Sequence, residues 1–206
     1  MKRNVYAMIL ATALIVLSAG TTRAGDAFNR PGPYLGIGPS GALTNFSGDF
    51  SGFGNSYGAN FRGGYRFNDY LAIEGLYEYM DDFGASRTSR NLQRKASASI
   101  QTHNFSLLAK VIFPTLGLPQ LQPFVMGGIG FLNANGSGKL EVRGTTVAED
   151  IEAPSDTEFA GRVDGGVDYF FTPELSTFFD VGYVIPTGDL SGMNYLSLGA
   201  GVKYSF

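Results

Sequence analysis

The sequence contains no cysteine and no tryptophan, and its single histidine is His103. Without cysteine the chain forms no disulfide, performs no thiol chemistry and carries no lipid on a cysteine. Histidine-dependent catalysis would have to be built around one residue. These absences leave packing, or a membrane environment, to stabilise the fold.

Long apolar runs are also absent after residue 24, so any insertion into a membrane would have to use strands. The one apolar run, residues 5–19, follows Lys2 and Arg3 and precedes Thr22-Arg23-Ala24. This pattern predicts a cleaved signal peptide at residues 1–24 and leaves residues 25–206 as one exported domain. A transmembrane anchor is the alternative, but a run of about 15 residues is short against the roughly 20 that span a bilayer.

The charge balance of residues 25–206 is acidic. Without Lys2, Arg3 and Arg23 the 15 basic residues fall to 12 against 18 acidic ones, a net charge of −6. A general nucleic-acid-binding protein carries a basic footprint, so we expect no nucleic-acid partner.

The end of the chain alternates apolar residues with small or polar ones and stops on an aromatic. Leu196, Val202 and Tyr204 fall on one face of a period-2 strand, together with the terminal Phe206, while Lys203 falls on the other. Terminal residues are usually frayed and polar. The pattern therefore predicts that the terminus belongs to a strand with one oily face.

The same alternation recurs along the chain and predicts eight strands. They cover residues 34–42, 57–67, 71–79, 100–113, 123–134, 159–170, 175–186 and 194–206. In most of them one face is apolar and the other polar, although the pattern of the glycine-rich segment 123–134 leaves its facing open.

The connections between these strands alternate in length. The short ones are 68–69, 114–122 and 171–174; the long ones are 43–56, 81–99, 135–157 and 187–193. Aromatic residues collect near the short turns, and a smaller group lies near the long loops. They are Phe67, Tyr70, Phe113, Phe124, Tyr169, Phe171, Tyr204 and Phe206 at the first end, and Tyr77, Tyr79, Phe159 and Tyr183 at the second. These features predict an all-β, eight-stranded antiparallel transmembrane barrel with two aromatic girdles.

Ten charged residues fall on the polar faces, which would line the interior of such a barrel. They are Arg62, Arg66, Glu74, Glu78, Lys110, Arg162, Asp164, Asp168, Asp180 and Lys203. Eight strands enclose an interior just wide enough for side chains, so these charges must pair or keep water. We favour a structural plug of salt bridges over a gated polar path for small solutes.

The alternating strands and the Tyr204-Ser205-Phe206 ending resemble the small outer-membrane barrel family that includes the OmpA transmembrane domain, OmpX and the opacity-type proteins. The resemblance covers residues 33–206 and implies a location in the outer membrane of a Gram-negative cell. It also implies that the barrel-assembly machinery reads the last strand, where Gly201, Tyr204 and Phe206 occupy the matching positions. The chain stops at the barrel, so we expect no peptidoglycan-binding domain.

His103 is the only candidate for a catalytic base, and its surroundings argue against catalysis. Some eight-stranded outer-membrane enzymes deacylate lipid A with a histidine and a serine two residues later, but position 105 is Phe. Ser106 falls on the opposite face of the strand, so no hydroxyl is placed for activation. Glycines 127, 128 and 130 lie within a strand rather than at a nucleotide-binding turn. We therefore expect no catalytic, cofactor or metal site.

The long loops differ in charge. Arg87, Arg90, Arg94 and Lys95 cluster in the second loop, whereas acidic residues dominate the third. Both loops can be simply solvated, or the basic segment can contact lipopolysaccharide phosphates or an acidic cell-surface ligand of a host.

The function predicted from these observations is that of a non-enzymatic outer-membrane barrel, a monomer surrounded by membrane lipid and lipopolysaccharide. Its long loops would carry a structural, adhesion or surface-interaction role. Two alternatives are a narrow pore or lateral route for small or hydrophobic solutes and, second, a lipid A-modifying enzyme. A soluble lipocalin-like barrel is disfavoured because its interior would be apolar and its exterior polar.

Overall fold

The computed structural model describes residues 28–45, 54–89, 94–115, 117–142, 145–152 and 156–206. Within these ranges the chain forms nine strands and the short 3₁₀ helix η2 (Gly188–Leu190). The strands are β1 (Gly32–Thr44), β2 (Ser56–Arg66), β3 (Leu71–Ser89), β4 (Arg94–Ile112), β5 (Leu121–Val142), β6 (Thr145–Glu152), β7 (Asp156–Phe170), β8 (Leu175–Pro186) and β9 (Tyr195–Ser205). No helix in the described residues is long and apolar enough to cross a membrane.

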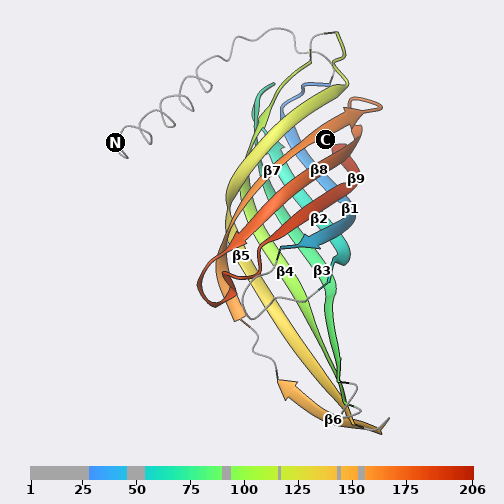
Figure 1. The fold of residues 1–206 in the computed structure, drawn as a ribbon. Coiled ribbons are helices and arrows are strands. Elements are labelled where there is room, and N and C mark those ends of the chain that lie inside the picture. The colour runs from blue at the N-terminus through green and yellow to red at the C-terminus, as the bar shows by residue number, and fades with distance from the viewer. Residues whose placement is uncertain (1–27, 46–53, 90–93, 116, 143–144, 153–155) are drawn as a thin grey trace.

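Eight of these strands close into an antiparallel barrel (Figure 1). Pairing runs from β1 to β5 in sequence order, continues from β5 to β7, β8 and β9, and closes where β9 pairs with β1. At the seam Leu35 lies opposite Tyr204 and Ile37 opposite Val202. The predicted eight-stranded antiparallel barrel is confirmed, and its last strand is held in the wall by two neighbours.

The two faces of each strand lie as the alternation predicts. Phe61, Tyr65, Leu107 and Val202 are exposed on the outside, whereas others of the oily face, such as Tyr77 and Leu196, are half-buried. The facing of β5, which the sequence left open, is settled by the buried Phe124, Met126 and Leu132 and the exposed Val125, Ile129 and Phe131. Phe124 therefore lies inside the barrel and does not belong to the girdle near the short turns. Its ring stacks against an interior cation instead of lipid.

Two glycines of β5 permit a close approach of neighbouring backbone. A Cβ atom on Gly128 would collide with the Leu107 carbonyl, and one on Gly130 with the Phe105 carbonyl. Tight packing of β4 against β5 explains this glycine-rich segment.

The predicted loops 81–99 and 135–157 are largely strand, which corrects the sequence interpretation. β3 and β4 stay paired as far as Ser89 and Arg94, and β5 pairs with β6 as far as Val142 and Thr145. Figure 1 shows this sheet extension, defined as residues 84–89, 94–99, 135–142 and 145–152, projecting beyond the barrel with β6 at its far end. The prediction ended each strand where the oily face ended, but backbone pairing continues without one.

Two buried apolar clusters share the lumen with the charged residues. The cluster at the loop end includes Met80, Phe83, Leu132 and Val184. The other lies among the charges, because the register places Leu76 opposite Arg62 and Leu108 opposite Glu74. The ionic groups therefore occupy the middle and the short-turn end of the lumen.

Candidate functional site

The charged residues of the lumen form three connected groups, and the first surrounds Arg162 of β7. The Arg162 Nη1 atom lies 3.1 Å from Glu78 Oε1, and its Nε atom donates to Asp164 Oδ1 at 2.9 Å. Two residues of β9 complete the shell of Glu78: the Tyr195 hydroxyl donates at 3.1 Å and the Ser197 hydroxyl at 2.5 Å. One cation here serves two carboxylates, so this group carries a net charge of −1.

The second group lies beside it and is built on Arg62 of β2. Arg62 Nη1 is 2.8 Å from Asp180 Oδ2 and 3.4 Å from Glu74 Oε1. The guanidinium carbon lies 3.8 Å from the centre of the Phe178 ring, and Nε donates to Asn60 Oδ1. The side chain is 1% exposed, so these contacts replace all of its hydration.

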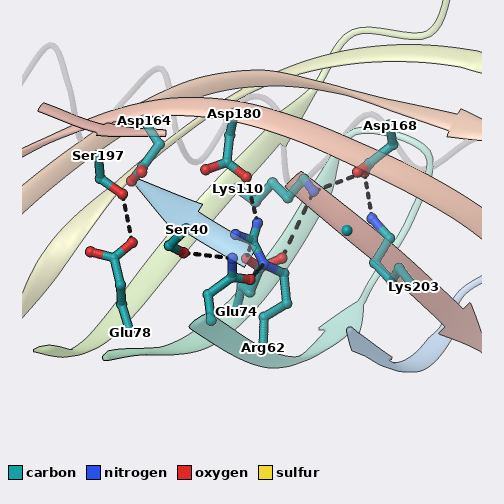
Figure 2. Close-up of polar contacts among 12 residues, drawn as sticks. Ser40, Arg62, Glu74, Glu78, Lys110, Asp164, Asp168, Asp180, Ser197 and Lys203 are labelled. Carbon is teal, nitrogen blue, oxygen red and sulfur yellow. Dashed lines mark hydrogen bonds and ion pairs between the residues drawn. The ribbon is translucent and has the colours of Figure 1, made fainter. Parts of the chain in front are cut away.

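The third group joins two lysines to one aspartate (Figure 2). Lys110 of β4 and Lys203 of β9 both contact Asp168 Oδ2, at 2.8 and 2.6 Å. Lys110 also lies 3.8 Å from Glu74, whose other partner is the Tyr34 hydroxyl at 2.8 Å. This group carries a net charge of +1 and connects to the second through Glu74.

Arg66 is the tenth predicted interior charge, and its contacts are hydrogen bonds rather than ion pairs. Its guanidinium donates to the backbone carbonyls of Phe28, Asn68 and Asp69 and to the side chains of Asn29 and Gln122. Gln122 Nε2 also donates to Asn29 at 2.7 Å. The segment that precedes β1 is thereby fastened into the short-turn end of the barrel.

The loop end of the lumen is covered by apolar side chains. The connection between β8 and β9 folds back so that Leu190 of η2 and Met193 are buried among Phe83, Val184 and Tyr195. The Phe83 and Tyr195 rings lie 6.0 Å apart. The described lumen is therefore capped at its loop end by this layer, whereas at the short-turn end a cavity of about 80 Å³ lies beside Arg66 and reaches Lys110, Asp168 and Lys203.

Several interior residues were not found from the sequence. Tyr34, Asn60, Gln122, Tyr195 and Ser197 complete hydrogen bonds to the ten charges. Asn60 of β2 and Tyr195 and Ser197 of β9 could have been found, because the period-2 alternation places them on the inward face of their strands. The segment 123–134 offered no assigned facing, so Gln122 just before it gave no such signal.

Two interior glycines also belong to the charge network. A Cβ on Gly182 would strike the Asp164 carboxylate, and one on Gly199 would crowd Asp180 and Arg62. Their absent side chains make room for the ion pairs, a role that only the fold reveals.

The residues of the predicted assembly signal divide between the two faces of β9. Tyr204 and Phe206 are 49% and 68% exposed on the lipid side, and their ring centres lie 5.1 Å apart. Gly201 faces inward, where a Cβ would collide with the Phe178 ring and the Ile37 carbonyl. Close packing is thus a structural requirement at Gly201, separate from any recognition of the terminal aromatics.

The basic residues of the second predicted loop fall at the tip of the β3–β4 hairpin. Arg87 lies near the end of β3, and Arg94 and Lys95 begin β4, opposite Ser89 and Thr88. Arg90 lies outside the described residues. For Arg87, Arg94 and Lys95 the structure describes the backbone but not the side chains.

His103 lies on the outer face of β4, where its Nδ1 atom is 2.8 Å from the Tyr77 hydroxyl. Phe105 is the next residue on that face. Ser106 lies on the inner face, and its hydroxyl donates to Asn104. A cluster of three carboxylates lies at the loop-end rim and is formed by Asp156, Glu158 and Asp189. The sequence did not predict this cluster, because Asp189 is far along the chain from the other two residues.

A comparison with protein families identifies this architecture. Residues 10–206 match the model of the outer membrane protein beta-barrel domain. The chain belongs to this family. In such outer-membrane barrels the short turns face the periplasm and the long connections face outward, so the sheet extension is external. The predicted signal peptide lies outside the described residues.

Solved structures share the fold of this outer-membrane barrel. Neisserial surface protein A has a TM-score of 0.58 at 17% identity, covering 84% of this chain and 97% of that one. Ail, the attachment invasion locus protein of Yersinia pestis, has a TM-score of 0.52 at 15% identity, covering 86% and 100%. OprG from Pseudomonas aeruginosa has a TM-score of 0.61 at 12% identity, covering 88% and 99%. The search of curated proteins gave no match.

Proposed function

We propose that this barrel is a non-enzymatic surface-interaction protein. The barrel with its closed lumen serves as a scaffold, and the external sheet extension binds the ligand. The observation that carries the proposal is the ion-paired lumen, combined with strands that continue beyond the oily band. A pore needs an open, water-filled lumen instead.

The middle of the lumen is occupied by ion-paired side chains, and a cavity of about 80 Å³ at the short-turn end reaches Lys110, Asp168 and Lys203. Arg62 and Arg162 are fully buried and bridge strands on different sides of the wall. Separating such pairs leaves buried charges without partners, at a cost of several kcal/mol for each. A solute path along this axis would require that separation, so a structural plug is favoured over a pore or gated path.

The sheet extension contains residues of both charges, and the register places Glu141 of β5 opposite Lys95 of β4. Arg87, Arg94 and Lys95 lie at the β3–β4 tip, whereas β6 carries Glu149, Asp150 and Glu152 in its sequence. Arginine clusters suit phosphate and sulfate because the guanidinium group forms paired charge-assisted hydrogen bonds. We therefore assign polyanionic glycans, including lipopolysaccharide, as the ligand class of the tip.

One solved neighbour supports this ligand class. Ail of Yersinia pestis was solved in complex with sucrose octasulfate, a heparin analogue, and that structure shares this fold with a TM-score of 0.53 at 15% identity. The structural similarity supports only the fold; the ligand class is argued from the basic residues at the β3–β4 tip of this chain.

The test replaces Arg87, Arg90, Arg94 and Lys95 together with Gln and measures binding of heparin and of lipopolysaccharide to the purified barrel. We expect affinity to fall at least tenfold, because several charge-assisted contacts are removed. The matched control replaces Glu141, Glu149, Asp150 and Glu152 with Gln, which should leave binding unchanged or strengthen it. Unchanged binding in the first variant would refute the assignment.

The non-enzymatic part of the proposal is supported by the surroundings of His103. Its described partner is a tyrosine, and the nearest serine along β4 faces the lumen. Among the described residues, no serine or threonine hydroxyl is hydrogen-bonded to His103, so the serine–histidine arrangement of a lipid A deacylase is missing. The assembly role proposed for Tyr204 and Phe206 is consistent with two exposed aromatic rings at the end of the final strand.

A further inference from the structure

A row of aromatic side chains crosses five strands of the outer wall below the sheet extension. The strand register places Phe61 opposite Tyr77, Tyr77 opposite Phe105, Phe105 opposite Phe131 and Phe131 opposite Phe159. Ring centres are 4.7 Å apart for Tyr77 and Phe105 and 4.5 Å for Phe131 and Phe159. This aromatic row marks the external boundary of the oily surface.

An apolar groove of about 490 Å³ lies along the membrane side of the aromatic row. Besides the five aromatic residues it is lined by Gly75, Leu107, Ile129 and neighbouring backbone. The outward position of Gly75 supplies no side chain, so the wall is recessed between larger neighbours. Because the groove lies on the oily exterior, hydrocarbon is the solvent that fills it.

A polar row lies on the external side of the aromatic row and does not itself line the groove. The register places Tyr79 opposite His103, His103 opposite Asn133 and Asn133 opposite Thr157. The Asn133 side chain donates to Thr157 at 2.7 Å. From the membrane outward, this strip of wall therefore presents an apolar groove, an aromatic row and then hydrogen-bonding groups, which is the polarity of a single lipid molecule.

The hydrogen bond between Tyr77 and His103 leaves Nε2 of the imidazole without a partner among the described residues. When the Tyr77 hydroxyl donates to Nδ1, the neutral ring carries its proton on Nε2, and the protonated ring carries one there as well. In these two states Nε2 is a donor, whereas in the other neutral tautomer Nδ1 donates to Tyr77 and Nε2 is an acceptor. Asp81 is already engaged, because its carboxylate accepts hydrogen bonds from Tyr79 and Gln101.

We propose that this strip of the outer wall binds one phosphate-bearing lipid of the external leaflet, with an acyl chain in the groove and the phosphate on His103 Nε2–H. The site is separate from the basic tip of the β3–β4 hairpin. It does not depend on the polyanion-binding function proposed above.

Two substitutions separate the two halves of the site. His103→Leu removes the donor and keeps a side chain suited to the membrane boundary. Gly75→Leu fills the groove, and a Cβ at this position makes only ordinary contact, 3.6 Å from the Gly63 carbonyl oxygen. Gly165→Leu is the matched control, since a Cβ there meets nothing within 4 Å and Gly165 does not line the groove.

The experiment is native mass spectrometry of delipidated barrel in detergent, titrated with lipid A and with dephosphorylated lipid A. Every sample carries Gln in place of Arg87, Arg90, Arg94 and Lys95, so that the basic tip does not contribute, and wild-type here means unchanged at residues 75, 103 and 165. Wild-type protein should retain one lipid A and prefer it over the dephosphorylated form about tenfold, the value of one charge-assisted hydrogen bond. His103→Leu should abolish that preference. Gly75→Leu should weaken both lipids, and Gly165→Leu neither. Heat-modifiable migration verifies folding, and Gly75→Val substitutes if Gly75→Leu fails this check.

Equal retention of the two lipids by wild-type protein would overturn the role of His103. Equal losses in Gly75→Leu and Gly165→Leu would overturn the groove as a specific site. Because the basic tip is replaced in every sample, a failure here is distinguishable from a failure of polyanion binding.

Discussion

Asp168 is the interior residue whose loss we expect to be most costly, because two lysines share it. Its Oδ2 atom lies 2.8 Å from Lys110 and 2.6 Å from Lys203, and all three side chains are at most 4% exposed. Asp168→Asn leaves two buried cations facing each other without their common anion. Removing one member of a buried ion pair costs about 3–5 kcal/mol, and we expect the free energy of unfolding to fall by about this amount.

Lys203→Met is the informative comparison, because it leaves Asp168 paired with Lys110. The loss of one hydrogen bond to a charged group should cost about 1–2 kcal/mol. Adding Lys203→Met to Asp168→Asn should restore part of the stability, since it removes one of the two stranded lysines. Glu174→Gln is the surface control: its ion pair with Arg30 is 3.9 Å long and exposed, and should contribute less than about 0.5 kcal/mol.

Reversible denaturant unfolding in lipid vesicles, followed by heat-modifiable migration, measures these differences. The expected order of destabilisation is Asp168→Asn, then the double variant, then Lys203→Met, then Glu174→Gln. If Lys203→Met destabilises the barrel as much as Asp168→Asn does, the idea of a shared anion is wrong.

Two further changes test the ends of the barrel. Arg66→Ala strands several buried acceptors and should lower the free energy of unfolding by about 3 kcal/mol while increasing hydrogen exchange in residues 28–32; unaltered exchange there would refute the fastening role. Deleting Phe206 should slow insertion by the assembly machinery far more than it changes the stability of barrel already folded, and equal insertion rates would leave the terminal aromatic only a structural role.

The strands of the barrel wall were predictable because lipid contacts one face of each strand and the lumen the other, so apolar and polar residues alternate within the strand itself. Residues such as Phe61 and Arg62 alternate between lipid and lumen, and the period of two reads directly from the sequence. Closure followed from the even number of strands and the strand-like last residues. The facing of β5 was not readable, because glycines at 127, 128 and 130 carry no side chain that distinguishes the two faces.

The inward position of all ten charges was also within reach of the sequence, but their partners were not. Arg162 and Glu78 are 84 residues apart and meet only because closure brings β7, β9 and β3 around one lumen. The capping residues Leu190 and Met193 lie in a segment that looks like an ordinary loop. The sheet extension was missed because strands above the membrane need no oily face, so the signal used to find strands ends at the membrane boundary.

The central claim is that the lumen is closed by paired charges in its middle and by the apolar layer at its loop end. Conductance of the purified protein in a planar lipid bilayer tests it most directly. We predict that heat-modifiable, correctly folded protein inserts without producing steady single-channel currents. Uniform, long-lived conductance steps from such protein would contradict the account.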